Sequence, residues 1–204
     1  MRLPKTLAAT AGRGKTPTPP EAREPSDFFP NFPLDSPVFP RETVGVSETA
    51  YLSLGSNLGD RAANLRAALA QLNAAGPLAA LSAFYETQPV DMPDQPWFLN
   101  CVAAINTDKS PRELLRLALK IESEMGRLRV RHKGSRNIDI DLLLFGDRVI
   151  DEPGLKIPHP AMHKRRFVLE PLAEIAPQAR HSQLGKTALE LLMALGDGQT
   201  VRRL

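Results

Sequence analysis

Two aspartates, Asp139 and Asp141, stand two positions apart in the stretch I-D-I-D-L-L-L-F that begins at Ile138. Isoleucine and aspartate alternate there, which is the period-2 pattern of a β-strand with one apolar and one polar face. Alternation places both carboxylates on the same face, with their Cα atoms about 6.6 Å apart at a rise of roughly 3.3 Å per residue. Side chains at that spacing can converge on hard cations, and Mg²⁺ is commonly held by one or two carboxylates together with substrate phosphates.

The plain alternative is a half-exposed strand whose solvated face carries the two aspartates. Aspartate is poorly suited to strands, however, and two on one face repel each other unless positive charge lies nearby. That charge stands just upstream, interspersed with glycines, in Arg127, Arg129, Arg131, Lys133 and Arg136. Because the planar guanidinium pairs with two phosphate oxygens at once, the combination indicates a site for a metal-bridged polyphosphate.

The chain has 204 residues, enough for one domain of about 150 residues and a tail. Residues 1–47 hold nine of the 19 prolines and show no sustained periodicity, so we predict a disordered extension there and a folded domain over 48–204. The basic, acid-poor start leaves a transit peptide as the alternative to an ordinary tail. The lone Cys101 excludes an internal disulfide framework and is typical of a reducing, cytoplasmic compartment. No apolar run approaches the ~18 residues of a membrane span.

Hydrophobic periodicity predicts six core elements. Strands are expected at 49–54, 78–85, 98–105 and from 138 onward, and helices from Asp60 to Gly76 and from Ser110 to Gly126. The order strand, helix, strand, strand, helix, strand is that of a ferredoxin-like α+β sandwich, an antiparallel sheet with two helices on one face. A C-terminal extension with a short helix near 187–195 follows. This fold hosts many functions, so it decides none.

Three further residues and one loop have both a structural and a functional interpretation. Asn100, near Phe98 in a predicted strand, could satisfy its amide with the backbone or with a flat heterocycle. His159 stands between two prolines in a rigid loop, where it could cap a turn or contact a phosphate. Glu122 could be a surface glutamate, or a ligand or arginine-orienting group near the basic stretch. The loop G-S-N-L-G that begins at Gly55 is favoured as a tight turn over a phosphate-binding loop.

Five motifs, taken together and in order, resemble the 6-hydroxymethyl-7,8-dihydropterin pyrophosphokinase family over about residues 50–177. They are Y-L-S-L-G-S-N-L-G-D, F-Y-E-T-Q-P-V, Q-P-W-F-L-N, K-G-S-R-N-I-D-I-D-L-L-L-F-G and P-H-P-A-M-H-K-R-R-F-V-L-E-P-L. The resemblance implies transfer of the pyrophosphoryl unit of ATP to the pterin's hydroxymethyl oxygen in folate biosynthesis, with release of AMP and use of two Mg²⁺ ions. It implies a pyrophosphokinase domain over 48–204.

The resemblance also assigns site residues by motif position. Asp139 and Asp141 would hold the metal ions and, with Arg127 and Arg136, form the catalytic set. The ATP-binding residues would be Glu122, Arg129, His159 and Arg165. The pterin-binding residues would be Thr87, Gln88, Val90, Phe98, Asn100 and Phe167. We expect a monomer without nucleic-acid or membrane partners, and an association with other folate enzymes stays open. Lys133 and Asp91 depart from the family pattern, at positions where an aromatic residue and a glycine, respectively, are common.

Three rival functions are weighed against this one. A nucleic-acid-binding module of the same fold would carry stacking aromatics on its central strands, where this chain has acidic residues that repel phosphate without a metal. A metal-dependent phosphohydrolase would also use two aspartates in a D-x-D motif to bind metal, and it would cleave a nucleotide without a pterin. A non-catalytic interaction protein would act through the proline-rich tail.

Overall fold

A computed structural model of the protein describes residues 47–89, 95–126, 135–196 and 198–204. The predicted extension lies outside this part of the chain except for its last residue, and its boundary with the domain stays a prediction. The predicted site residues Val90, Arg127 and Arg129, and the departures Asp91 and Lys133, also lie outside it. No helix within the described ranges is long and apolar enough to cross a membrane.

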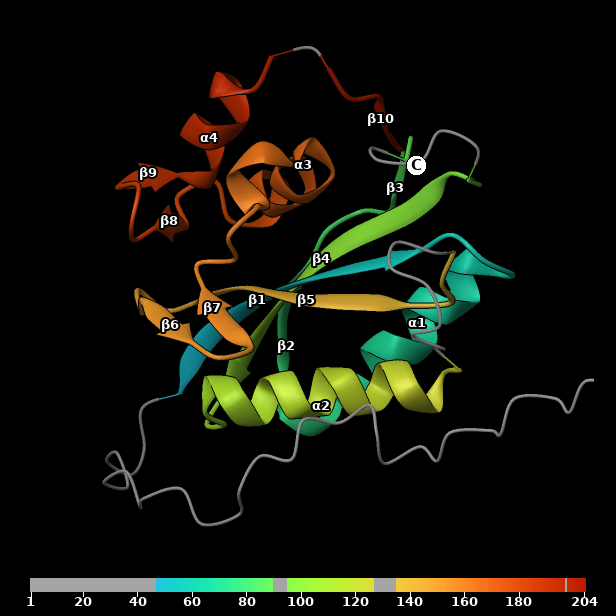
Figure 1. The fold of residues 1–204 in the computed structure, drawn as a ribbon, viewed down its shortest axis with the longest axis horizontal. Coiled ribbons are helices and arrows are strands. Elements are labelled where there is room, and N and C mark those ends of the chain that lie inside the picture. The colour runs from blue at the N-terminus through green and yellow to red at the C-terminus, as the bar shows by residue number, and fades with distance from the viewer. Residues whose placement is uncertain (1–46, 90–94, 127–134, 197) are drawn as a thin grey trace, which may run out of the picture. The chain divides into compact units, whose positions relative to one another are not determined.

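The described residues form a six-stranded antiparallel sheet with its path in the order β10-β3-β4-β1-β5 (Figure 1). Its long central strands are β4 (Phe98–Thr107) and β1 (Glu48–Ser56), and β5 (Asp139–Phe145) lies at one end. The strand β3 (Tyr85–Thr87) and the C-terminal β10 (Val201–Arg203) lie at the other, while β2 (Leu78–Leu81) pairs with β4. The sheet thus joins segments from both ends of the domain.

Two helices cover one face of this sheet, as predicted: α1 (Arg61–Leu72), followed by the short 3₁₀ helix η2 (Asn73–Ala75), and α2 (Pro111–Glu124). Asp60 caps α1 by accepting a hydrogen bond from Ala63 N. Ser110 and Glu113 form the capping box expected for α2. The βαββαβ order and the antiparallel pairing confirm the ferredoxin-like α+β fold.

A second helical layer covers part of the opposite face. It consists of α3 (Arg166–Ile175), which contacts β4, and α4 (Ala188–Ala194), which packs on α3 (Figure 1). The expectation of helices on one face was therefore incomplete, and Cys101 and Val102, neighbours on β4, are both fully buried because each face has a core. The remaining elements are the hairpins β6 (Ile150–Glu152) with β7 (Leu155–Ile157) and β8 (Arg180–His181) with β9 (Lys186–Thr187), and the 3₁₀ helix η3 (Met162–Lys164).

The strand predicted over 78–85 is divided into β2 and β3. Ser82 interrupts it, because its hydroxyl accepts a hydrogen bond from Val102 N at 3.0 Å and donates one to Ala83 O at 2.8 Å. A side chain thereby takes a place in the ladder that the backbone would otherwise fill. The chain then resumes pairing with β4 at Tyr85.

The alternation predicted for β5 holds as far as Leu142 and ends in a bulge. Leu52 pairs with Leu142 and Tyr51 with Leu144, so Leu143 is the extra residue, and it faces the second core together with Leu144. The carbonyl of Leu143 accepts a hydrogen bond from His159 N at 2.8 Å. The bulge therefore lies where the loop carrying His159 meets β5.

Candidate active site

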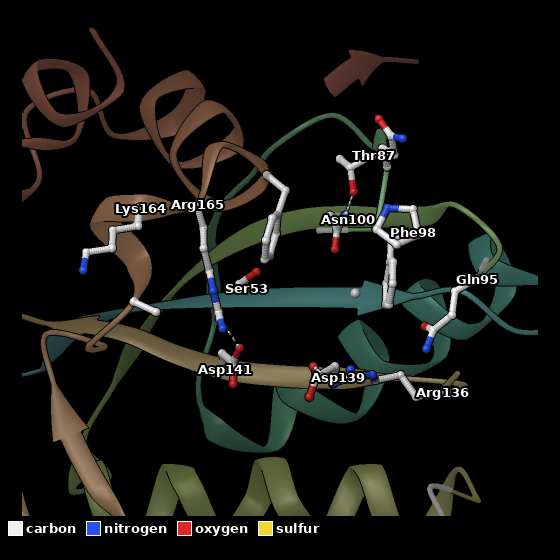
Figure 2. A pocket seen from close by; sticks show the side chains of 15 residues that line it. Ser53, Thr87, Gln95, Phe98, Asn100, Arg136, Asp139, Asp141, Lys164 and Arg165 are labelled. Carbon is white, nitrogen blue, oxygen red and sulfur yellow. Dashed lines mark hydrogen bonds and ion pairs between the residues drawn. The ribbon is translucent and has the colours of Figure 1, made fainter. Parts of the chain in front are cut away.

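A cavity of about 330 Å³ opens on the face of the sheet opposite α1 and α2 (Figure 2). Its lining comes from β1, β3, β4, β5 and the segment that leads into α3, so segments far apart in the sequence meet there. The predicted site residues that line it are Thr87, Gln88, Phe98, Asn100, Arg136, Asp139, Asp141, Arg165 and Phe167. The lining residues that sequence reasoning did not select are Ser53, Gly55, Pro89, Gln95, Ala161 and Lys164.

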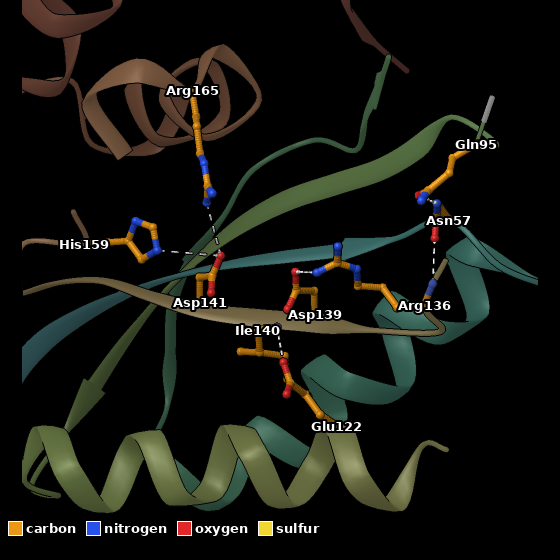
Figure 3. A network of polar contacts seen from close by, with 9 residues as sticks. All are labelled: Asn57, Gln95, Glu122, Arg136, Asp139, Ile140, Asp141, His159 and Arg165. Atoms are coloured by element: carbon orange, nitrogen blue, oxygen red, sulfur yellow. Dashed lines mark hydrogen bonds and ion pairs between the residues drawn. The ribbon is translucent and has the colours of Figure 1, made fainter. Parts of the chain in front are cut away.

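Asp139 and Asp141 both line the cavity, and Ile140 between them is buried on the other side of β5. Each carboxylate meets a cation from a different segment (Figure 3). Arg136 donates a hydrogen bond to Asp139 Oδ2, and Arg165 Nη1 lies 3.6 Å from Asp141 Oδ2. The cavity therefore combines two carboxylates with two guanidiniums, the composition expected for a site that receives phosphates and a divalent cation.

His159 lies beside the cavity, with Nε2 4.0 Å from Asp141 Oδ2. Its Nδ1 accepts a hydrogen bond from Ala161 N at 3.2 Å, which in the neutral imidazole leaves the proton on Nε2, facing the carboxylate. Burial lowers the pKa of His159 and Arg165 acts in the same direction, while Asp141 raises it; the net direction is downward. The ring is thus a fixed N–H donor at the carboxylate end of the cavity.

The other end of the cavity combines a buried amide with two aromatic rings. Asn100 is 3% exposed and donates a hydrogen bond from Nδ2 to Thr87 Oγ1 at 2.7 Å. Its Oδ1 faces Gly55, where an added Cβ would lie only 2.6 Å away. The guanidinium of Arg136 lies over the ring of Phe98, 5.7 Å from its centroid. That of Arg165 lies over the ring of Phe167, at 5.6 Å. This end of the cavity is suited to a flat polar heterocycle.

The family comparison agrees with this arrangement. A model of the family 7,8-dihydro-6-hydroxymethylpterin-pyrophosphokinase (HPPK) matches residues 51–177, which is more than half of the chain. The chain belongs to the HPPK family. Members of this family are ATP-dependent pyrophosphokinases, so the resemblance inferred from the motifs is confirmed.

Two curated relatives named 2-amino-4-hydroxy-6-hydroxymethyldihydropteridine pyrophosphokinase illustrate the match. The one from Bacillus subtilis is 47% identical over 135 residues, which cover 65% of this chain and 81% of the relative. The one from Methylorubrum extorquens is 48% identical over 131 residues, which cover 63% of this chain and 82% of the relative.

Among solved structures, HPPK-DHPS from Plasmodium falciparum, a triple mutant with SDX-DHP, has a TM-score of 0.60 and 19% identity to this chain. The match covers 74% of this chain and 45% of that one, so the chain spans less than half of the solved protein. This similarity supports the HPPK fold.

Glu122 of this HPPK chain lies beneath β5, on the side of the sheet away from the cavity (Figure 3). It is 2% exposed, so the interpretation of Glu122 as a surface glutamate is wrong. Its Oε1 accepts a hydrogen bond from Ile140 N at 2.8 Å. In the described part of the chain β5 pairs only with β1, so Glu122 satisfies an edge N–H and holds the strand between the two aspartates. Its predicted contact with ATP stays a prediction.

Asn57, in the loop after β1, is the main positioning residue that sequence reasoning missed. It is 2% exposed, and its Oδ1 accepts a hydrogen bond from Arg136 N at 2.8 Å. Its Nδ2 donates one to Gln95 Oε1 at 3.1 Å (Figure 3). The loop G-S-N-L-G is therefore hydrogen-bonded to two other loops of the HPPK site, those that contain Arg136 and Gln95. A polar residue between glycines was the only signal in the sequence, and it does not identify the partners.

Proposed function

We propose that the protein transfers the pyrophosphoryl group of ATP to the hydroxymethyl oxygen of 6-hydroxymethyl-7,8-dihydropterin, giving AMP and the pterin diphosphate, in folate biosynthesis. The observation that carries this proposal is the two-ended cavity. Asp139 and Asp141 stand at one end and the Asn100 amide, with its flanking aromatic rings, at the other. Membership of the HPPK family supports the same reaction.

The pterin is assigned to the aromatic end. A flat ring between Phe98 and Phe167 would stack on apolar surface and place its amide-like edge against Asn100. Thr87 accepts a hydrogen bond from Asn100 Nδ2, which fixes the orientation of the amide and leaves its oxygen toward Gly55 and the cavity. Thr87 and Gln88 complete this proposed subsite, and Val90 joins them by motif position.

The phosphates are assigned to the carboxylate end. Asp139 and Asp141 provide hard oxygen donors on one strand face, which fit the Mg²⁺ ions proposed here. When bound, Mg²⁺ would neutralise charge on the phosphate oxygens. Arg136 and Arg165 line the same cavity and present planar guanidiniums suited to the transferred group. The proposed contacts of Arg127, Arg129, Glu122 and His159 with ATP rest on motif position.

A product assay tests the reaction. Purified protein would receive Mg-ATP with and without the pterin, and AMP and pterin diphosphate would be counted. We expect equal amounts of both products, only with pterin present, and a loss of about 10³-fold or more in Asp139→Asn and in Asp141→Asn. Asp147→Asn, the same change in an exposed turn, is the matched control. ADP or free phosphate formed without pterin would instead establish a phosphohydrolase.

The cellular setting is also a proposal. Cys101 is a buried free thiol, which supports a reducing compartment such as the cytoplasm. We propose a monomeric enzyme that associates with a second enzyme of folate synthesis, by analogy with the solved protein named HPPK-DHPS. Light scattering of the full chain, alone and mixed with that second enzyme, would measure both the oligomeric state and the association.

A further inference from the structure

The N-terminus of α3 is capped by a side chain from a distant segment of the chain. Its N-cap residue, Arg165, makes no side-chain capping bond within the described structure. The first-turn amide of Phe167 instead donates a hydrogen bond to Gln199 Oε1 at 3.3 Å. First-turn N–H groups have no partner inside a helix, so this side chain from 32 residues downstream satisfies a group that would otherwise need water. Gln199 therefore holds the turn that carries both Arg165 and Phe167.

The residues after Gln199 hold the opposite wall of the cavity. Gln88 N donates a hydrogen bond to Thr200 O at 3.2 Å, and Val201 pairs with Thr87 in the β10–β3 ladder. Thr87 and Gln88 face the cavity from the end of β3. Three consecutive residues, 199–201, thus connect the start of α3 to the end of β3.

The C-terminal segment, defined here as residues 198–204, is itself anchored by its last residues. Arg203 pairs with Glu174 on α3 at 2.6 Å, and the guanidinium of Arg202 lies 5.2 Å from the ring centroid of Trp97. Leu204 N donates a hydrogen bond to Phe84 O at 2.9 Å. These contacts tie the segment to α3, to Trp97 and to the residue that precedes β3. A segment fixed in this way can set a distance between two walls.

We propose that Gln199 is a positioning residue for the pterin end of the cavity. It acts through Phe167, whose amide it caps, and through Gln88, whose amide is bound by the next residue of the same segment. The identity of the ligand rests on the proposed function, but the capping interaction does not. Gln199 lies outside the part of the chain that matches the family model, residues 51–177.

The chemistry of the Gln199 side chain defines the variants. Only its oxygen caps the helix, and its Nε2 is buried without a hydrogen-bond partner among the described residues. Gln199→Glu keeps an oxygen acceptor at a helix N-terminus, where a carboxylate is favoured, and removes the unpaired N–H groups. Gln199→Ala removes the cap. Gln183→Ala makes the same change in the exposed turn between β8 and β9 and is the matched control.

Two measurements test the proposal on the full chain. In steady-state kinetics, Gln199→Ala should raise the KM for the pterin about 5-fold, equivalent to ~1 kcal/mol for a lost cap, with the KM for ATP changed less than about 2-fold. Gln199→Glu should restore the pterin KM, and Gln183→Ala should leave all constants unchanged. In amide hydrogen exchange, Phe167 and Gln88 should exchange faster in Gln199→Ala alone.

The outcomes separate this inference from the proposed function. A wild-type pterin KM together with wild-type exchange at Phe167 in Gln199→Ala would overturn the positioning role. So would a loss that Gln199→Glu does not repair, or an equal rise of both KM values. If the wild-type protein turns over no pterin, the proposed function fails. Exchange at Phe167 and Gln88 then still decides the inference: faster exchange in Gln199→Ala alone supports it, and unchanged exchange overturns it.

Discussion

The guanidinium of Arg165 and the carboxylate of Asp141 lie 3.6 Å apart, joining the start of α3 to β5 across the cavity. Both groups are partly exposed, with side-chain exposures of 36% and 37%, so the pair contributes little to stability. Its significance lies in the position of the charges. When a ligand binds, the guanidinium of Arg165 can leave Asp141 and pair with an anionic group of the ligand. The carboxylate of Asp141 can then pair with a bound cation.

Replacing Arg165 should reduce catalysis more than stability. We expect Arg165→Ala to lower kcat by about 10²–10³-fold, and Arg165→Lys to recover only a small part, because an ammonium lacks the bidentate geometry of the guanidinium. Steady-state kinetics with both variants would measure this. Arg116→Ala, on an exposed position of α2, is the control. Full activity of Arg165→Lys would show that charge alone suffices.

Glu122 should matter first for the stability of β5. Glu122→Ala leaves the edge N–H of Ile140 buried without its acceptor, so we expect the free energy of unfolding to fall by about 1–3 kcal/mol. Glu122→Gln keeps an oxygen for that N–H and should lose less. Denaturant unfolding would measure the difference, and the Kd for ATP would be determined alongside. Weaker ATP binding in a fully stable Glu122→Gln would support a direct contact with the nucleotide instead.

A side chain at position 55 should close the amide end of the cavity. The added Cβ of Gly55→Ala would approach Asn100 Oδ1 to 2.6 Å, so the amide must turn or β4 must shift. We expect the KM for the pterin to rise about 10-fold or more, with a smaller change for ATP, as typical of a loss of ground-state binding at one subsite. Gly196→Ala, where an added Cβ meets no atom within 4 Å, is the control. An unchanged pterin KM would remove Asn100 from the proposed subsite.

Glu174 should make the attachment of β10 dependent on pH. Burial raises the pKa of Glu174, but hydrogen bonds donated by Tyr85, Arg203 and Ala83 N outweigh it, and the net pKa is lowered. A lowered pKa in the folded state stabilises the protein above the unfolded value of about 4.3, and this stabilisation is lost as the pH falls through the folded pKa. We expect Glu174→Gln to melt about 2–4 °C below wild type at pH 7, a shift of ~1 kcal/mol in a domain of this size.

The same comparison at lower pH provides the check on Glu174. As the pH falls through the lowered folded-state pKa, the wild-type carboxylate loses its charge, so the difference between the two melting temperatures should shrink. Calorimetry at several pH values would follow it. A difference that stays constant from pH 7 down to the acid unfolding of the protein would mean that the charge of Glu174 contributes nothing.

Local patterns in the sequence predicted the elements and the chemistry of the carboxylate end. Alternation in β5 was sufficient to put Asp139 and Asp141 on one face, and the capping residues Asp60 and Ser110 marked the starts of both predicted helices. These features depend on neighbours within a few residues. The break at Ser82 was missed because it depends on a hydrogen bond from Val102, 20 residues away.

The sequence by itself determined the βαββαβ order of the core, the acidic strand face and the family to which the chain belongs. Only the tertiary structure decided which distant residues hold the site residues in place. Glu122 holds β5 from below, Asn57 fixes Arg136, and Gln199 caps the helix that carries Phe167. Each of these contacts joins residues from separate segments of the chain. Periodicity and capping rules describe interactions along the chain, so they carry no information on which buried polar group will meet which distant partner.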